Sequence, residues 1–292
     1  MKAAIWTSYL IEYLPREMVK TFASHGWQYL ELSDEHGHDL LKEGEPLATG
    51  ESFRRYATDY GISFPQGHFC LATKGCRADD LPGREVMDIA PPEKKDFQAA
   101  LETMKRWVDL FQGLGIKAGV LHAGGDKAMK AGWSPEKIFE HRVKAVRQVA
   151  EYSRGSGIII CLENMNVPGL RTVSELLAIK QATGMDNIGL CLDTGHAIIS
   201  RVNPAVFVKE AGTTLQALHI ADNLGTNDDH MLPYGRGVIA WNEVMKSLRE
   251  INYLGPFNLE VPGENRCPLP ARLIKLDYAR NLVSWMTEFD GL

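Results

Sequence analysis

Short apolar runs alternate with segments of helical periodicity from one end of the chain to the other. Eight runs have the length and composition of β-strands: residues 3–9, 29–33, 62–69, 118–124, 158–165, 188–197, 215–223 and 256–261. Apolar residues recur with helical spacing in segments between them, such as 94–114, 135–154, 173–183, 241–251 and 271–289. Alternating strand and helix units predict parallel strands with helical crossovers. Eight such units in 292 residues predict an α/β fold, a closed (β/α)₈ barrel, with residues 1–292 forming a single domain.

An open, doubly wound sheet is the alternative, because it has the same alternation of elements. That fold usually carries a glycine-rich phosphate-binding turn after its first strand, and no such turn follows residues 3–9. The longest irregular stretch, residues 74–93, is expected to be a loop over the active-site face of the barrel.

Ionisable residues fall at the carboxyl ends of the last four predicted strands. Successive side chains of a strand point to opposite faces, so Cys161 and Glu163 share one face and Ile160 and Leu162 share the other. Bulky aliphatic residues indicate the face that packs on helices, which leaves the other face for the barrel interior. The same alternation assigns these residues of the other three strands to the interior: Gly189, Cys191 and Asp193; Leu215, Ala217 and His219; Asn258 and Glu260.

Glu163, Asp193, His219 and Glu260 are therefore expected to meet inside one end of the barrel. A bare cluster of three carboxylates would be destabilised by lost hydration and by mutual repulsion. A divalent cation removes both problems, and carboxylates with one imidazole suit Mn²⁺, Mg²⁺, Co²⁺ or Zn²⁺. We predict a divalent metal site with these four ligands. Taken singly, each residue is equally explained as a loop cap or a hydrogen-bonded core side chain.

Further polar residues are placed to extend this site, as ligands or as substrate contacts. They lie at other strand ends or in the loops that follow: His68, His122, His196, Asp228 and His230. Arg236 is a weaker candidate, since it lies in the loop after the seventh strand, where barrels often bind phosphate. Trp6 is another, because its flat ring suits the apolar side of a sugar. His36 and His38 could reach the rim from the loop after the second strand, but an exposed polar loop explains them as well.

Composition limits the partners of the chain. A net charge of −5 without a long basic run disfavours broad nucleic-acid binding, which depends on phosphate contacts. No apolar stretch approaches the roughly 20 residues that a membrane span needs. The start of the chain lacks a small-residue cleavage site and is expected to be a strand rather than a signal peptide. The five cysteines form no CxxC pair and leave one over, so we expect reduced thiols in a cytoplasmic protein.

The segments LENMN, CLDTGHA, HIADNLGTNDDHMLPYGRGVIAW and NLEVPG resemble, in order, the last four strand signatures of the xylose isomerase-like superfamily of TIM barrels. This superfamily holds sugar isomerases and epimerases and also endonuclease IV. Its single-metal members imply Glu163, Asp193, His219 and Glu260 as the ligands, with the two glutamates as an acid–base pair. The resemblance implies an isomerase or epimerase that acts on a sugar, sugar phosphate or keto-sugar through an enediolate. It also implies that His196 hydrogen-bonds the substrate and that the chain forms a homo-oligomer.

Two departures bear on the substrate class. Free-ketose 3-epimerases carry a substrate-binding glutamate six residues after the fifth-strand ligand and an arginine six residues after the seventh-strand histidine. This chain has Gly169 and Gly225 at those positions. The departures argue against a free ketose as the substrate.

The resemblance to endonuclease IV supplies the first alternative, a multi-zinc phosphodiester hydrolase. The nine ligands of its three-zinc cluster match in residue type: His68, His122, Glu163, Asp193, His196, His219, Asp228, His230 and Glu260. Against it, His68 is followed by Phe69 rather than that family's Pro-Tyr turn. The sequence also has no basic, aromatic-bearing loop suited to separating the strands of a duplex. The second alternative is a silent sugar-binding barrel or partner subunit, which the presence of both glutamates disfavours.

Overall fold

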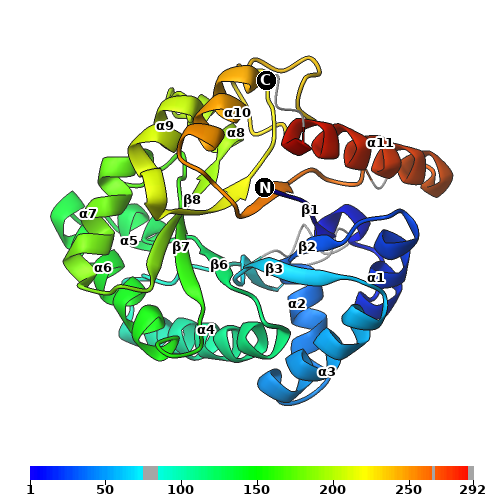
Figure 1. The fold of residues 1–292 in the computed structure, drawn as a ribbon. Helices are drawn as coiled ribbons and strands as arrows, with labels where there is room; N and C mark the ends of the chain where they lie inside the picture. Colours follow the sequence, from blue (N-terminus) through cyan, green and yellow to red (C-terminus); the bar gives the residue numbers. More distant parts are fainter. Residues whose placement is uncertain (75–84, 265–266, 289–292) are drawn as a thin grey trace.

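Eight parallel strands form a nearly closed barrel in the computed structural model, which describes residues 1–74, 85–264 and 267–288 (Figure 1). The strands are β1 (Lys2–Trp6), β2 (Tyr29–Leu32), β3 (Ser63–His68), β6 (Ala118–Leu121), β7 (Ile159–Glu163), β8 (Ile188–Asp193), β9 (Leu215–His219) and β10 (Pro256–Leu259). Each pairs with its successor from β1 to β9, and β1 also pairs with β10. A parallel bridge between Ile220 and Leu259 joins the last two strands. The predicted (β/α)₈ barrel is confirmed.

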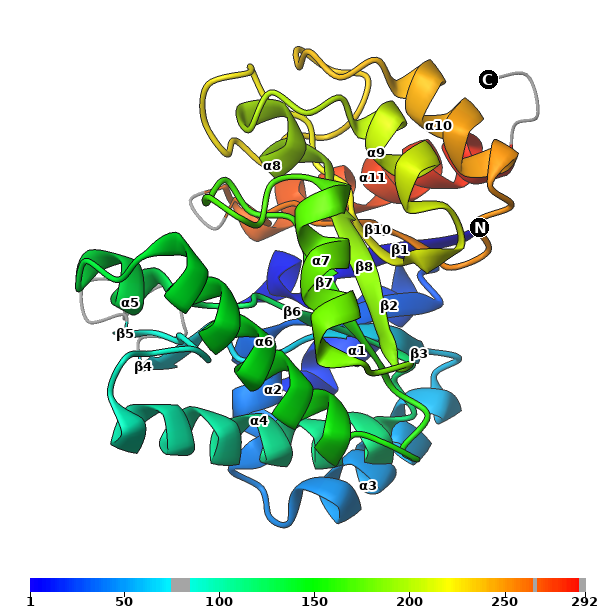
Figure 2. The ribbon, with the colours of Figure 1, turned by 90° about the vertical axis from the view of Figure 1, so that its left-hand side faces the viewer.

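Helices lie outside the ring of strands, as Figures 1 and 2 show. They are α1 (Pro15–Ser24), α2 (Asp34–Leu41), α3 (Pro46–Asp59), α4 (Lys94–Leu114), α5 (Asp126–Lys130), α6 (Pro135–Tyr152), α7 (Val173–Thr183), α8 (Thr194–Ile199), α9 (Pro204–Ala211), α10 (Trp241–Glu250) and α11 (Leu269–Glu288). Side-chain capping fixes the residues at which several helices begin. The Ser134 hydroxyl accepts the Lys137 N–H ahead of α6, and Thr172 and Glu175 form a capping box at α7. Within the described residues, no helix is long and apolar enough to cross a membrane.

All eight predicted strands extend past the carboxyl ends of the observed strands, by one to four residues. Residues 188–197 were expected to be one strand, but β8 ends at Asp193 and α8 begins at Thr194. The Asp193 carboxylate accepts the His196 N–H at 2.6 Å, which caps the new helix. Similarly, β1 ends at Trp6, and a 3₁₀ helix (Thr7–Leu10) follows it. In the expected loop 74–93, Ala72–Lys74 and Glu85–Val86 form an antiparallel pair, β4 and β5, while residues 75–84 lie outside the described residues.

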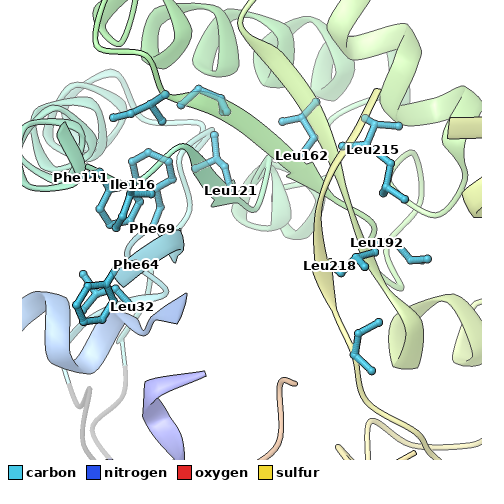
Figure 3. Close-up of a cluster of buried hydrophobic side chains, with 14 of the residues drawn as sticks. Leu32, Phe64, Phe69, Phe111, Ile116, Leu121, Leu162, Leu192, Leu215 and Leu218 are labelled. Carbon is cyan, nitrogen blue, oxygen red and sulfur yellow. The ribbon is translucent and has the colours of Figure 1, made fainter. Parts of the chain in front are cut away.

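Two separate apolar clusters lie on the two faces of the strands. A small interior cluster consists of Ala118, Val120, Cys161, Cys191 and Ala217. The large cluster between strands and helices includes Leu162, Leu192 and Leu218, of which Figure 3 shows a part. The predicted alternation is thus confirmed for these residues, but it is wrong for Leu215. The register shifts so that Leu190 pairs with Leu215 and Cys191 with Ala217, and Leu215 consequently joins the outer cluster.

Candidate metal and substrate site

The ends of four neighbouring strands bring their ionisable side chains together, as predicted. Glu163, Asp193 and His219 are the last residues of β7, β8 and β9, and Glu260 directly follows β10. Each offers one ligand atom, and these atoms all lie within 4.8 Å of one another. All four side chains are buried. Burial of three carboxylates at this spacing is the arrangement that a divalent cation stabilises.

Unpartnered atoms point to the centre of this cluster. Among the described residues, Asp193 Oδ2, His219 Nδ1 and Glu260 Oε2 are buried and have no hydrogen-bond partner. His219 Nδ1 lies 3.3 Å from Glu163 Oε1 and 3.4 Å from Glu260 Oε2. Buried polar atoms without partners are costly, so their convergence indicates a bound group. The oxygen-rich donor set with one imidazole fits Mn²⁺, Mg²⁺, Co²⁺ or Zn²⁺.

The other ring nitrogen of His219 contacts a buried carboxylate on the opposite side of the barrel. His219 Nε2 donates to Glu31 Oε1 at 2.9 Å, and Glu31 lies on β2. Glu31 also accepts hydrogen bonds from Gln66 Nε2, at 2.9 Å, and from Asn258 Nδ2. The sequence analysis did not single out Glu31. A signal was available, because Glu31 is a charged residue in the middle of a short apolar strand.

Asn164 holds β7 and β8 together beside the cluster. Its Oδ1 accepts the Asp193 N–H at 2.7 Å, and its Nδ2 donates to the Asp193 carbonyl at 2.9 Å. Its own carbonyl accepts from His196 Nδ1 at 3.0 Å. The side chain of Asn164 is fully buried. It therefore fixes the backbone of one candidate ligand and orients a neighbouring histidine, and the sequence analysis missed it.

A pair of histidines contacts Glu163 from the side of β3 and β6. His68 Nε2 lies 3.3 Å and His122 Nε2 3.0 Å from Glu163 Oε2. His68 Nδ1 donates to the Phe69 carbonyl at 2.7 Å, which turns its Nε2 toward the carboxylate. Glu163 and the two histidines form a second group with metal-ligand spacing.

A third polar group lies over the cluster at the rim of the barrel. Asp228 Oδ2 lies 3.2 Å from His196 Nε2 and 3.1 Å from His230 Nε2. His230 Nδ1 donates to the Glu260 carbonyl at 2.8 Å, and His196 Nδ1 lies 3.2 Å from Glu163 Oε1. All nine predicted ligand candidates are thus contiguous in the structure.

The two weaker candidates, Arg236 and Trp6, do not belong to this contiguous group. Arg236 is exposed and lines a cavity of about 460 Å³ that opens beside His230, while Trp6 is half-buried at the end of β1.

The prediction of an exposed loop for His36 and His38 is wrong. Both lie on α2, where His36 is fully buried and its Nε2 donates to the Tyr13 carbonyl at 3.0 Å. His38 Nε2 donates to the Ala72 carbonyl at 2.7 Å.

Comparison with known proteins agrees with this architecture. The family model described as the xylose isomerase-like TIM barrel matches residues 19–288. The chain belongs to this family. A D-psicose 3-epimerase from Enterocloster bolteae is 30% identical over 261 residues, 88% of this chain and 79% of that protein. An inosose isomerase from Bacillus velezensis is 22% identical over 244 residues, 80% of this chain and 82% of that protein.

Solved structures show the same fold. The D-psicose 3-epimerase from Clostridium cellulolyticum H10, solved with D-tagatose, superposes with a TM-score of 0.81 at 19% identity, over 99% of this chain and 100% of that chain. The prediction of an enzyme related to sugar isomerases and epimerases is confirmed by the names of these family members.

The two glutamates of this xylose isomerase-like barrel have pKa shifts in opposite directions. Burial raises the pKa of Glu260 to about 8, against the lowering effect of His219 and His230. Burial acts in the same direction on Glu163, but His219 and His122 outweigh it and hold its pKa well below the usual value. Burial lowers the pKa of His196, yet Asp193, Asp228 and Glu163 raise it to about 12. The site thus favours negative charge on Glu163 and a proton on Glu260.

Proposed function

We propose that this protein is a divalent-metal-dependent sugar isomerase or epimerase in which Glu163 and Glu260 form the acid–base pair. The observation that carries the proposal is the convergence of Glu163, Asp193, His219 and Glu260 with unpartnered atoms at its centre. Family members of similar length that are named as 3-epimerases and isomerases support it. Mn²⁺, Mg²⁺, Co²⁺ and Zn²⁺ all fit the donor set.

The chemistry follows from what each side chain can do. When bound, the cation supplies positive charge beside a carbonyl and a neighbouring hydroxyl oxygen of the sugar, which acidifies the carbon-bound proton between them. Either Glu163 or Glu260 takes that proton, and the substrate becomes an enediolate. The other glutamate returns a proton to the opposite face of the same carbon, which epimerises it; return to the neighbouring carbon isomerises the sugar. His196 is placed to hydrogen-bond a substrate oxygen.

The cavity beside His230 is the expected place for the rest of the sugar. It holds about 460 Å³ and is walled by Tyr9, Met231, Leu232, Val261, Pro262 and Tyr278 among others. These side chains offer apolar surface to the carbon chain. Charged residues also line the cavity: Arg236, Lys275, Asp229 and Glu264.

A free ketose is not the expected substrate, because Gly169 replaces the substrate-binding glutamate of free-ketose 3-epimerases, and a larger residue would be strained at this position. Gly169 has φ of +80°, and a Cβ there would lie 2.9 Å from Arg142 Nη1. Arg142 is buried and donates to the Pro168 carbonyl at 2.9 Å, so it cannot easily move. The expected substrates are keto-sugars or sugar phosphates, which would be bound through residues other than a glutamate at position 169.

An exchange experiment tests the proposal. The Mn²⁺-loaded protein is incubated in D₂O with inosose, D-psicose, L-ribulose and ketose phosphates, and the products are analysed by NMR. The proposal predicts a stereoisomer or position isomer of at least one substrate, with deuterium at the carbon that lost its proton. Conversion without deuterium uptake contradicts an acid–base pair that exchanges with solvent, and no conversion across a broad panel contradicts the proposed activity.

The three contiguous donor groups favour one second candidate, a multi-zinc phosphodiester hydrolase. The additional groups are His68 and His122 on Glu163, and Asp228 with two histidines at the rim. Bridged zinc ions would activate water for attack on phosphorus. Cleavage of a duplex with one abasic site by the Zn²⁺-loaded protein would support this candidate, and an intact duplex would eliminate it.

A further inference from the structure

We infer that Glu31 is a positioning residue, which fixes the tautomer of His219 and thereby sets the affinity of the site for its cation. This inference rests on the proposed function, because it concerns the same metal site. Glu31 touches neither the substrate cavity nor the centre of the four-residue cluster. It acts through His219 alone.

The contact joins two elements that are far apart in sequence and lie across the interior of the barrel. Glu31 and His219 are 188 residues apart, and both side chains are fully buried. Their 2.9 Å separation is that of a charge-assisted hydrogen bond. No water competes for either partner at this depth, so the bond holds the ring in one orientation.

Donation to Glu31 decides which nitrogen of His219 is free to bind a cation. An imidazole that binds a cation is neutral and carries one N–H, and the 2.9 Å contact with the acceptor-only Glu31 carboxylate assigns that N–H to Nε2. The Nδ1 lone pair then points to the centre of the cluster, where it lies 3.3 Å from Glu163 Oε1 and 3.4 Å from Glu260 Oε2. The other tautomer would set a nitrogen lone pair against the Glu31 carboxylate, which is repulsive.

Two amide side chains hold Glu31 in its acceptor role. Gln66 Nε2 donates to Oε1, and Asn258 Nδ2 donates to Oε2. Gln66 Nε2 also lies 3.1 Å from the carbonyl of Leu218, the residue before His219. Both carboxylate oxygens of Glu31 thus face N–H donors from neighbouring side chains. A carboxylate behind a ligand histidine orients the ring and makes it a stronger donor to the metal.

The test is the variant Glu31→Gln, which keeps the size of the side chain and removes its charge. The Gln66 and Asn258 amides each have an unpartnered oxygen and can turn to accept from the new amide, so the variant removes the negative charge behind His219 without leaving a buried donor unpaired. The Mn²⁺ dissociation constant, measured by chelator competition on the folded protein, is expected to rise about 10- to 100-fold. Glu35→Gln is the matched control, since Glu35 is also a buried carboxylate and accepts only the Ser8 hydroxyl among its described hydrogen bonds. Its Mn²⁺ dissociation constant is expected to stay within twofold of wild type.

A second measurement needs no change at Glu31. In the Zn²⁺-loaded wild-type protein with ¹⁵N-labelled histidine, the ring of His219 is expected to show a protonated Nε2 and a metal-shifted Nδ1. The signal is assigned by its absence in His219→Asn. A protonated Nδ1 would overturn the inference, as would a Glu31→Gln protein that binds Mn²⁺ within twofold of wild type. If wild-type protein binds no cation, the proposed metal-dependent function fails; if only the effect of Glu31→Gln is missing, this inference alone fails.

Discussion

His219 Nδ1 lies 3.3 Å from Glu163 Oε1, while Nε2 of the same ring donates to Glu31. Two acceptor atoms at this separation repel each other unless a proton or a cation lies between them. Glu260 Oε2 lies 3.4 Å from the same nitrogen. Unpartnered polar atoms of the cluster thus surround one point, and a divalent cation bound there would interact with all of them at once.

Removing either proposed acid–base group should abolish turnover and leave the fold intact. Glu163→Gln and Glu260→Gln are each expected to lower kcat by at least about 10²- to 10⁴-fold, because each variant loses an acid–base group, which contributes that much, and also a ligand of the proposed cation. The rate is measured at saturating Mn²⁺, with circular dichroism to verify folding. Glu210→Gln, at an exposed position of α9, serves as the control. Near-normal activity in either glutamate variant would remove the pair from the mechanism.

Metal binding should stabilise the barrel. A cation that binds only the folded chain adds about 2.7 kcal/mol at 100 times its dissociation constant. Stripping the protein with a chelator is therefore expected to lower its Tm by several degrees, and Mn²⁺ should restore it. Asp193→Asn removes one ligand charge from the cluster, so its Tm should respond much less to Mn²⁺. An equal response in wild type and Asp193→Asn would show that the stabilising ion binds elsewhere.

Asn164 should matter for stability and for metal affinity together. Asn164→Ala leaves the buried N–H and carbonyl of Asp193 without their partner, which costs about 1–3 kcal/mol of unfolding free energy. The Mn²⁺ dissociation constant should also rise, because Asp193 loses its fixed position. Urea unfolding and chelator competition measure the two effects. Asn166→Ala, at an exposed position nearby, should change neither by much, and equal effects in both variants would contradict the positioning role of Asn164.

Asp228 distinguishes the two candidate functions. Its Oδ2 contacts only the rim histidines His196 and His230 among the described ion pairs, and it is not in the four-residue cluster. Asp228→Asn is therefore expected to keep the same number of tightly bound Zn²⁺ ions as wild type, by elemental analysis. Loss of one ion relative to wild type would place a second metal at the rim and favour the hydrolase.

Strand periodicity predicted the centre of the site because it depends on rules that act locally. Side chains alternate along each strand, and parallel strands end at the same edge, so Glu163, Asp193 and His219 could be brought together without coordinates. The same rule failed at Leu215, where a register shift changes the face. Alternation assumes regular pairing, and a bulge is set by the partner strand rather than by the residue itself.

The supporting residues could not be predicted in this way, because their partners are distant in sequence. Glu31 meets His219 only after the barrel has closed. His36 illustrates the same limit, since its ring contacts the Thr7 hydroxyl and donates to the Tyr13 carbonyl, both in the segment that follows β1. Asp228 and His230 were placed near the site by their position in the loop after the seventh strand, and the structure brings them within hydrogen-bond distance of each other.

The central claim is that the four strand-end residues hold a divalent cation that the reaction requires. The most direct test is to count ions by elemental analysis after the purified protein has been stripped, reloaded with Mn²⁺ and desalted. About one tightly bound ion per chain is predicted for wild type, with the ion lost in Glu163→Gln and retained in Glu210→Gln. A wild-type chain that retains no ion, or that keeps it when Glu163 is changed, would contradict the claim.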